Sequence, residues 1–394
     1  MRVLIVNKFW YARGGDCVVA MGTVDLLRRM GHDVEVFSMH HPNNVECDYT
    51  VTYAPEVHFD GNLVQKIRAM VRAMSDRNVR NSFTATIERF HPDVVHLHNI
   101  HSYLSPLVAQ IAHEHGCRVV WTMHDYKVFC PSYSCLRNGT TCDSCIEHPM
   151  DVVVNRCMKD SLIASIAALL ESTKWNVNKL AQYVDKFICP SQFMAKKLKD
   201  AGISSDKLAV ITNFLPDDKR DTSSIITGRA DYCCYIGRIS HEKGIETMLD
   251  AASTLPFTLK VAGNGPMLQT LKEKYAHCKN IEFLGLLDSN NVTKLLRLTR
   301  FSVMPSQWWE NNPLSIIESL CAGTPVVGTD IGGIPELIDN SCGILVPTGD
   351  VKALANAMQE AWDMRWDHAA IARHATSRFS PTVHYQALTE VYHP

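Results

Sequence analysis

Short, continuous apolar runs alternate with amphipathic stretches over the first half of the chain. Residues 2–6, "RVLIV", precede a helical pattern that Gly31 closes, and "DVEVFS" follows as the next predicted strand. A strand, a helix and a strand in this order, with strands apolar on both faces, are typical of a parallel sheet covered by helices. The same rhythm predicts strands at 93–99, 118–125, 184–191 and 208–213, and helices at 103–115 and 192–201.

The rhythm stops over residues 214–230, a polar and turn-rich segment that we interpret as a linker, and then restarts. Predicted strands follow at 232–238, 257–265, 281–287, 301–306 and 324–330, and predicted helices at 244–254, 266–276, 290–299, 313–322 and 351–364. The sequence therefore predicts an α/β protein with two doubly wound, Rossmann-like domains, residues 1–213 and 214–379. Ligands of such sheets bind outside the carboxyl ends of the strands, so the loops after the strands are the first places to search.

Composition narrows the class of protein further. A length of 394 residues fits two domains of ordinary size, and 46% hydrophobic with 20% charged residues is typical of a soluble globular protein. With a net charge of −2, the chain lacks the overall positive charge that would attract a nucleic acid. The N-terminal run lacks the apolar core of a signal peptide, and the longest apolar candidate, residues 161–172, is too short to span a bilayer. We expect a cytoplasmic protein with no nucleic-acid partner.

Two kinds of loop could bind an anion. Gly14 and Gly15 stand between a predicted strand and helix, where backbone N–H groups can approach an anion, although a plain tight turn is an equally good interpretation. Their spacing is not the dinucleotide pattern G-x-G-x-x-G, and "GNGPML" at 263–268 departs from it too. In "GRISHEKG", Arg238 and Lys243 lie in one loop, where two cations can neutralise a diphosphate; solvated surface charges are the alternative.

Two carboxylates flank a predicted helix start in "ENNPLSIIE". Asn312 as N-cap and Pro313 as the first helical residue predict where the helix begins. Glu310 then lies in the loop before the helix, and Glu318 lies inside it among apolar neighbours. A carboxylate accepts two hydrogen bonds, which suits the vicinal hydroxyls of a ribose or a hexose, and free N–H groups at a helix start suit phosphate.

On these residues the chain resembles the retaining glycosyltransferases of family four. The stretches that carry the resemblance are the Gly14-Gly15 loop, "MHD" with His124, "GRISHEKG", "VAGNGP" with Gly265, and the E-x7-E motif "ENNPLSIIE" followed by "AGTPVVGTDIGGIPELI". The resemblance implies the GT-B fold, in which two Rossmann-like domains face a central cleft, with the C-terminal helix 380–394 packing back on the N-terminal domain. Asp16-Cys17 and Asn311-Asn312 depart from many relatives, which bears on the choice of donor or acceptor.

The resemblance also implies roles for individual residues. Arg238 and Lys243 would bind the diphosphate of a nucleotide sugar, Glu318 the ribose, and Glu310 the donor sugar. The expected catalytic residues are His124, Arg238, Lys243 and Glu310. The expected donor-binding residues are Gly14, Gly15, Gly265, Asn311, Asn312, Pro313, Leu314, Glu318 and Phe283, the last through its backbone near the base. We expect no metal and no cofactor besides the nucleoside diphosphate sugar, because the nearest approach to a metal-binding DxD motif is "PDD" at 216–218, in the linker.

The resemblance implies a retaining, metal-independent hexosyltransferase. It would move a sugar to a glycan or lipid-linked acceptor in surface polysaccharide or glycoconjugate biosynthesis. A nucleotide-sugar epimerase or hydrolase with the same two domains is the main alternative. A dehydrogenase would explain two Rossmann-like domains, but the missing G-x-G-x-x-G argues against it. A non-catalytic binding protein fits least, because it would not need both cations and both carboxylates together.

Two further patterns carry hypotheses of their own. Cys130, Cys135, Cys142 and Cys145 have spacings that could hold zinc, or they form a loop of reduced thiols. Residues 62–83 combine apolar and basic residues at helical spacing: Leu63, Ile67, Met70, Val71 and Met74 with Lys66, Arg68, Arg72, Arg77 and Arg80. That pattern suits peripheral contact with an anionic membrane, and it equally suits a core-facing helix with a basic outer face.

Overall fold

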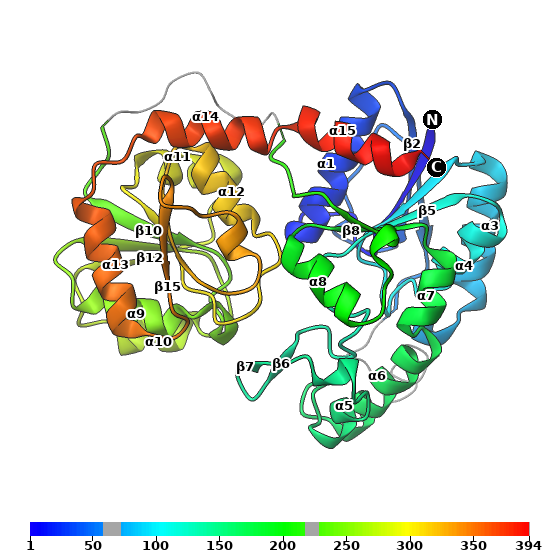
Figure 1. The fold of residues 1–394 in the computed structure, drawn as a ribbon, viewed down its shortest axis with the longest axis horizontal. Helices are drawn as coiled ribbons and strands as arrows, with labels where there is room; N and C mark the ends of the chain where they lie inside the picture. The colour runs from blue at the N-terminus through cyan, green and yellow to red at the C-terminus, as the bar shows by residue number, and fades with distance from the viewer. Residues whose placement is uncertain (58–71, 217–227, 394) are drawn as a thin grey trace. The chain divides into compact units, whose positions relative to one another are not determined.

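The computed structural model describes residues 1–57, 72–216 and 228–393, and they divide into two compact units. Unit 1 comprises Met1–Arg137, Cys142–Thr212 and Tyr385–Pro394, and unit 2 comprises Asn138–Thr141 and Asn213–His384. Figure 1 shows a sheet flanked by helices in each unit. In the described part of the chain, no helix has both the length and the apolarity needed to cross a membrane.

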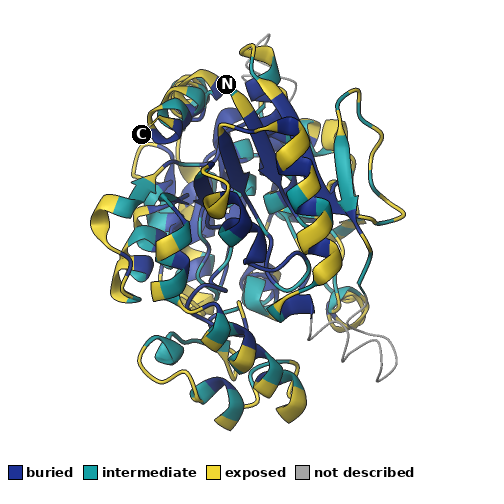
Figure 2. Cartoon of the chain, turned by 90° about the vertical axis from the view of Figure 1, so that its right-hand side faces the viewer, coloured by how far each residue is buried: buried dark blue, intermediate teal, exposed yellow. Residues whose placement is uncertain are grey.

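Unit 1 is built on a parallel sheet of seven strands in the order β3-β2-β1-β4-β5-β8-β9. The strands are β1 (Arg2–Val6), β2 (Asp33–Met39), β3 (Val51–Ala54), β4 (Val94–Leu97), β5 (Arg118–Thr122), β8 (Lys186–Cys189) and β9 (Leu208–Val210). Helices α1 (Gly15–Arg29), α3 (Arg77–Phe90), α4 (Leu107–Glu114), α7 (Val177–Tyr183) and α8 (Gln192–Asp200) lie in the same part of the chain. The central strands β1, β2 and β4 are almost entirely buried while the helices expose their outer faces, as Figure 2 shows. This burial on both sides is why these strands are continuous apolar runs in the sequence.

A long insertion separates β5 from β8. It carries the short strands β6 (Leu136–Arg137) and β7 (Thr140–Thr141), the 3₁₀ turn η1 (Ser144–Ile146) and helices α5 (Asp151–Val154) and α6 (Leu162–Lys174). A second 3₁₀ turn, η2 (Ser205–Lys207), precedes β9. The last helix, α15 (Pro381–Tyr392), places Leu388, Val391 and Tyr392 in the core of unit 1 against Val3 and Ile5 of β1.

Unit 2 repeats the design with six parallel strands in the order β12-β11-β10-β13-β14-β15. They are β10 (Tyr232–Ile236), β11 (Thr258–Ala262), β12 (Ile281–Gly285), β13 (Ser302–Met304), β14 (Val326–Thr329) and β15 (Gly343–Val346). The helices are α9 (Ile245–Ser253), α10 (Leu268–Lys274), α11 (Ser289–Leu298), α12 (Leu314–Cys321), α13 (Val351–Asp363) and α14 (His368–Arg378), with 3₁₀ turns η4 (His241–Lys243) and η5 (Ile334–Glu336).

Both sheets have the strand order of a Rossmann-like fold, so the predicted fold class is confirmed. In each sheet the direction of winding reverses between two adjacent strands, β1 and β4 in unit 1 and β10 and β13 in unit 2. Loops diverge at such a switch point and leave room for a ligand. The loops that follow these four strands are therefore where the structure is best suited to binding.

Local backbone geometry corrects one predicted helix. The pattern predicts a helix over 103–115, but α4 begins only at Leu107. Ser102 and Ser105 have φ angles of 62° and 64°, in the left-handed region, so the chain cannot be helical there. Ser102 is held in this geometry because its N–H and its hydroxyl both donate to the carboxylate of Glu171.

Glycines let the loops after β10 and β11 pack backbone to backbone. Gly263 has a φ of +139°, and a Cβ there would lie 1.9 Å from the carbonyl oxygen of Gly237. A Cβ on Gly265 would lie 2.2 Å from the carbonyl oxygen of Ile239. Hydrogen bonds from Gly237 N to Ala262 O (3.1 Å) and from Ile239 N to Asn264 O (2.9 Å) join the same two loops. The glycines of "VAGNGP" thus shape the loop that carries Arg238.

We predict that Gly263→Ala lowers the free energy of unfolding by about 3 kcal/mol, because it adds backbone strain and a clash with the Gly237 carbonyl. The matched control is Gly349→Ala in the same unit, where φ is +77° but the nearest atom lies 3.7 Å away, so that only the backbone strain of about 1 kcal/mol applies. Urea unfolding of both variants measures the difference. Equal losses in the two variants would show that the close approach does not constrain this loop.

Candidate active site

The loop after β10 brings Lys243 to the switch point of unit 2. Lys243 ends the 3₁₀ turn η4, and Gly244 follows with a φ of +65°. A Cβ on Gly244 would lie 1.9 Å from the carbonyl oxygen of Pro305, in the loop after β13. The two loops are also joined by a hydrogen bond from Gln307 N to Glu242 O (2.9 Å). The loop after β13 therefore passes directly beside Lys243.

Lys243 and Glu310 form an ion pair between these two loops. The distance from Lys243 Nζ to Glu310 Oε1 is 2.5 Å, and Ser306 Oγ donates to the same carboxylate oxygen at 3.0 Å. Glu310 is buried, and the ammonium of Lys243 lies 5.3 Å from the centre of the Trp308 ring. A buried carboxylate needs such partners, because losing water without them is costly. The pair places a cation with spare donors beside a fixed acceptor, which suits a phosphate next to a sugar hydroxyl.

Arg238 lies five residues before Lys243 and differs from it in environment. Its side chain is exposed, and its carbonyl oxygen accepts a hydrogen bond from the Tyr235 hydroxyl at 2.8 Å. Over the residues that the structure describes, no carboxylate forms an ion pair with the Arg238 guanidinium. A cation fixed through its backbone and open to solvent can accept an incoming anion without first breaking an ion pair.

The start of α12 corrects the predicted cap. The helix begins at Leu314 with Pro313 at the N-cap and no side-chain cap, whereas the sequence predicts Asn312 as N-cap and Pro313 as the first helical residue. Asn312 instead accepts a hydrogen bond from Asn213 N at 2.9 Å, and its carbonyl oxygen accepts one from Asn213 Nδ2 at 2.8 Å. This tertiary contact uses the side chain that a local cap would need. Asn311 and Pro313 remain half-buried beside it in the same loop.

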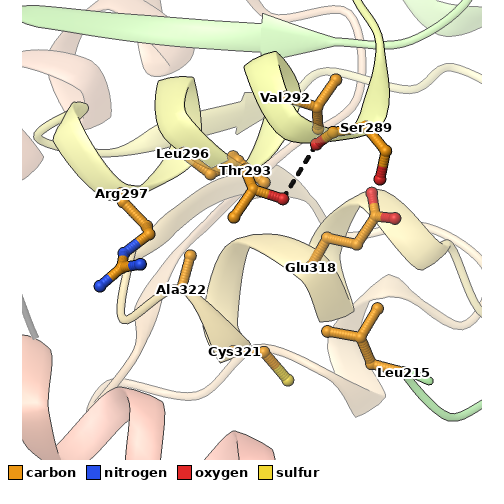
Figure 3. Close-up of a pocket in the computed structure, with 9 residues that line it drawn as sticks. All are labelled: Leu215, Ser289, Val292, Thr293, Leu296, Arg297, Glu318, Cys321 and Ala322. Carbon is orange, nitrogen blue, oxygen red and sulfur yellow. Dashed lines mark hydrogen bonds between the residues drawn. The ribbon is translucent and has the colours of Figure 1, made fainter. Parts of the chain in front are cut away.

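Glu318 lines a pocket between α11 and α12. The lining residues are Leu215, Ser289, Val292, Thr293, Leu296, Arg297, Glu318, Cys321 and Ala322. The pocket is a shallow hollow, and its empty space of about 390 Å³ includes open solvent. In Figure 3 the carboxylate of Glu318 points toward the side chain of Ser289, and Thr293 Oγ1 donates to Ser289 O at 3.0 Å. Glu318 is therefore a half-buried acceptor near hydroxyl groups, an arrangement that suits a sugar with vicinal hydroxyls.

Phe283 and Gly265 occupy two further places in unit 2. Phe283 lies on β12, the edge strand of the sheet, and its side chain packs against the core of the unit. Phe283 can therefore offer hydrogen bonds to a ligand only through its backbone. Gly265 lies after β11, and its N–H donates to Asn264 Oδ1 at 2.8 Å. Both residues lie in unit 2 with Arg238, Lys243, Glu310 and Glu318, while Gly14, Gly15 and His124 lie in unit 1.

In unit 1, α1 begins directly at the predicted glycine pair. Gly14 is the N-cap, its backbone is extended, and as a glycine it supplies no side-chain cap to the helix. Asp16 follows in the first turn and accepts a hydrogen bond from Asn99 Nδ2 at 2.9 Å. Asn99 N in turn donates to Asn7 Oδ1 at 3.1 Å, which joins the loops after β1 and β4 at the switch point.

His124 belongs to a stack of histidines above this switch point. The distance from His124 Nε2 to His98 Nδ1 is 2.9 Å, a hydrogen bond, and the two rings stack with centroids 5.2 Å apart. Burial lowers the pKa of His124 to about 4; the negative charge of Asp16 opposes this shift and Lys8 adds to it. Burial alone would raise the pKa of Asp16, but attraction to His124 and Lys8 and the bond from Asn99 hold it below its usual value. His124 is thus a neutral imidazole at pH 7.

Sequence reasoning missed several members of this cluster. It singled out His124, but it gave no role to Lys8, His98 or Asn99, and it noted Asp16 only as a departure from relatives. One available signal was that the predicted strand 93–99 ends within "HLHNIH", which places His98 and Asn99 at the carboxyl end of β4.

The structure does not arrange the four clustered cysteines as the ligands of a metal ion. In the described ranges, no group of three or more His, Cys, Asp or Glu side chains is arranged to hold a metal ion. Cys135 N donates to Cys130 Sγ at 3.3 Å, while Cys142 Sγ lies 3.3 Å from Ser144 Oγ. Hydrogen bonds from the Cys135 thiol and from neighbouring groups lower the pKa of Cys130 to about 6. The structure therefore favours the alternative of free thiols over zinc.

The predicted basic helix over 62–83 lies only partly within the described residues. Leu63, Ile67, Met70, Val71, Lys66 and Arg68 lie outside the described residues. Of the remainder, Arg72 is buried and donates to Tyr103 O at 2.8 Å, so it cannot contribute to a basic outer face. Arg77 and Arg80 are exposed on α3, a separate helix that begins at Arg77 after the N-cap Asp76.

Two family models match the chain and together span most of it. The model described as "Glycosyltransferase Family 4" matches residues 14–219. The model described as "Glycosyl transferases group 1" matches residues 218–378.

Curated relatives resemble the chain over different lengths. An uncharacterized 42.6 kDa protein in the cps region of Klebsiella pneumoniae is 25% identical over 356 residues, 86% of this chain and 87% of that protein. The O-antigen biosynthesis glycosyltransferase WbnH of Escherichia coli is 30% identical over 169 residues, 42% of this chain and 48% of that protein. The chain thus matches about half the length of this second relative.

Solved structures resemble the chain over nearly its full length. Anabaena Alr3699/HepE in complex with UDP and glucose has a TM-score of 0.69 at 16% identity, covering 99% of this chain and 98% of that one. WaaG, a glycosyltransferase involved in lipopolysaccharide biosynthesis, has a TM-score of 0.67 at 14% identity, covering 100% of both chains. At such identities the likeness shows the fold alone, which is that of GT-B proteins.

The environment of His124 predicts how its titration responds to its neighbours. Asp16→Asn should lower the pKa of His124 further, because it removes a negative charge that favours the imidazolium, and Lys8→Met should raise it. NMR titration of the His124 ring measures the pKa in each variant, with His124→Gln to assign the signal. Shifts of the same sign in both variants would contradict this account.

The lowered pKa of His124 also predicts that the stability of the protein depends on pH. Since the folded-state pKa lies below the unfolded value of about 6.5, the unfolded chain binds a proton that folded His124 does not. The contribution of His124 to the free energy of unfolding is therefore fully present above pH 6.5 and is lost as the pH falls toward 4. Urea unfolding should show a shallower loss of stability over this range in His124→Gln than in the wild type, and parallel curves would contradict the shift.

Proposed function

The chain belongs to glycosyltransferase family 4, and from this premise we propose that it is a retaining, metal-independent hexosyltransferase that uses a nucleoside diphosphate sugar. The acceptor is a glycan or a lipid-linked glycan, and the pathway is surface polysaccharide or glycoconjugate biosynthesis. Relatives named for O-antigen biosynthesis and a structural neighbour in complex with UDP and glucose support this choice. The observation that carries it is the Lys243–Glu310 pair at the switch point of unit 2.

The proposal assigns the donor to unit 2. Arg238 and Lys243 bind the diphosphate, and their charge stabilises the negative charge that develops as the nucleoside diphosphate departs. Since two cations neutralise the leaving group, the reaction does not require a divalent ion. Glu310 is held beside Lys243 at 2.5 Å, so a sugar hydroxyl bound by Glu310 lies next to the phosphate that Lys243 binds.

The nucleoside occupies the remaining features of the same unit. The ribose hydroxyls bind Glu318 in the pocket between α11 and α12, where Ser289 and Thr293 supply further hydroxyls. The base contacts the backbone of β12 around Phe283, the edge strand whose outer side has no neighbouring strand in the described sheet. Asn311, Pro313 and Leu314 shape the loop and the helix start that separate these subsites, and the backbone of Gly265 approaches the diphosphate.

The proposal assigns the acceptor to unit 1, with His124 as the candidate catalytic side chain there. As a neutral imidazole joined to His98, His124 can donate or accept one hydrogen bond to a sugar hydroxyl without adding a positive charge. Gly14 and Gly15 supply the uncapped N–H groups at the start of α1, which suit an anion.

We expect Glu310→Gln and Glu318→Ala to act on different kinetic constants. Glu310→Gln should lower kcat by about 10²–10³-fold, because the carboxylate stabilises positive charge that develops on the donor sugar. Glu318→Ala should mainly raise KM for the donor, by about tenfold, because ribose contacts are equal in ground and transition states. Steady-state kinetics, with water as acceptor where none is known, measures both.

The matched control is Glu360→Ala, an exposed glutamate on α13 of the same unit, which should leave both constants unchanged. Because Glu310→Gln also removes the partner of Lys243, urea unfolding of Glu310→Gln separates a folding defect from a catalytic one. If Glu310→Gln unfolds like the wild type but has lost kcat, the loss is catalytic. Wild-type kcat in Glu310→Gln together with lost kcat in Glu318→Ala would reverse the role assignment.

The reaction itself should proceed unchanged in EDTA and retain the anomeric configuration of the donor. Proton NMR of the product during turnover reports the configuration, and the rate with and without EDTA reports the metal requirement. Activity that is lost in EDTA and restored by Mg²⁺ would contradict the role given to Arg238 and Lys243. Release of an epimerised nucleotide sugar with no acceptor present would favour the epimerase instead.

A further inference from the structure

Helix α6 (Leu162–Lys174) turns its large apolar side chains outward. Ile163 is 71% exposed, and Leu162, Ile166 and Leu170 are between 40% and 47% exposed. The residues that the helix buries are Ser165, Ala168 and Glu171. This is the reverse of a surface helix in a soluble protein, which buries its apolar stripe and exposes its polar one.

Specific polar bonds fix this orientation. Glu171 forms a buried ion pair with Lys127 at 3.0 Å and accepts hydrogen bonds from Ser102 N and Oγ. Ser165 Oγ accepts a hydrogen bond from Met158 N at 3.1 Å. If the helix rolled to bury its leucines and isoleucines, it would break these bonds and leave Lys127 buried without its countercharge, which is strongly destabilising. The apolar face is therefore held outward by the rest of unit 1.

The neighbouring helix also carries exposed apolar side chains. Helix α5 (Asp151–Val154) packs against α6, and the two lie side by side in Figure 1. Val154 is 73% exposed and Met150, just before α5, is 58% exposed. The α5–α6 face consists of Met150, Val154, Leu162, Ile163, Ile166 and Leu170. Exposed apolar side chains gathered in this way mark an interaction surface, whereas scattered ones need no explanation.

Cations flank the α5–α6 face at both ends of α6. Arg156 and Lys159 are exposed in the turn before the helix, together with the acidic residue Asp160. At the other end, Lys174 and Lys179 both lie over the ring of Trp175, at 5.4 Å and 5.1 Å from its centre. Burial lowers the pKa of Lys174, and the charges of Lys179 and Arg80 lower it further, so three cations gather there.

We propose that the α5–α6 face docks on the surface of a lipid bilayer that contains anionic lipids. The apolar side chains enter the boundary between headgroups and acyl chains, and the flanking cations contact lipid phosphates. This arrangement fits a lipid surface better than a protein partner, because an apolar face with cations at both of its ends matches the layered chemistry of an anionic membrane. The docking surface does not depend on the proposed reaction, although a lipid-linked acceptor would be reached from the same membrane.

Vesicle flotation of the full chain tests the docking surface. The wild-type protein should float with vesicles of phosphatidylglycerol and phosphatidylcholine, float less with phosphatidylcholine alone, and float less as salt is raised. Val154→Ser/Ile163→Ser should weaken binding at least about tenfold, because both side chains leave the lipid. Lys174→Glu/Lys179→Glu should weaken it by a similar factor and reduce its dependence on salt.

Each variant has a control that makes the same kind of substitution elsewhere in the protein. Met30→Ser removes an exposed apolar side chain at the end of α1, and Lys272→Glu/Lys352→Glu makes the same change of charge in unit 2; both should bind like the wild type. Because Val154 and Ile163 are exposed, their replacement should leave the unfolding midpoint unchanged. Donor hydrolysis without vesicles should also be unchanged, so a failure here is distinct from a failure of the proposed reaction.

Three results would overturn the proposal. The first is no flotation of the wild-type protein with anionic vesicles. The second is equal flotation of the wild type and Val154→Ser/Ile163→Ser. The third is a wild-type dimer in sedimentation without lipid that Val154→Ser/Ile163→Ser converts to a monomer, because the face would then bind a second copy of the chain.

Discussion

The ion pair between Lys243 and Glu310 is the constraint around which the loops of unit 2 are arranged. A buried carboxylate is stable only with its hydrogen bonds and countercharge in place, and Lys243 and Ser306 provide them from two directions. The pairing requires the loops after β10 and β13 to meet. Gly244 allows this because its backbone lies so close to the Pro305 carbonyl that a Cβ would not fit between them. Glu310 O also accepts a hydrogen bond from Gly333 N at 2.6 Å, so the same residue orders the loop after β14.

In unit 1, the loops at the switch point are joined by different kinds of side chain. At its switch point, Asn7 and Asn99 join the loops with neutral amides, and the charged groups Lys8 and Asp16 lie around a neutral His124. The result is a polar cluster that can exchange hydrogen bonds with sugar hydroxyls, beside the uncapped start of α1. The two sheets have the same kind of strand order, but the loops at their switch points differ. Unit 2 has an ion pair there, whereas unit 1 has amides and a neutral histidine among charged groups, because the loops and not the sheets carry the chemistry.

The α5–α6 face shows how a buried polar network can determine a surface. Lys127 and Glu171 are both buried and paired, and they fix which side of α6 faces inward. From the sequence, residues 161–172 are an apolar segment that is too short to span a bilayer. The sequence does not indicate which side of this helix is exposed. That depends on Ser102 and Lys127, which are distant in the sequence.

The sequence alone determined the strand and helix rhythm, the two Rossmann-like sheets, and the loops that carry Arg238, Lys243, Glu310 and Glu318, because apolar periodicity and glycine positions are local signals. It missed β3, β15 and α14, whose short or weakly apolar stretches give little periodicity. Only the tertiary structure decided that Asn312 bonds to Asn213 instead of capping α12, that His124 has His98 and Asp16 as neighbours, and that the cysteines do not converge on a metal. Each of these depends on partners far apart in the chain, whose meeting is fixed by packing and not by local pattern.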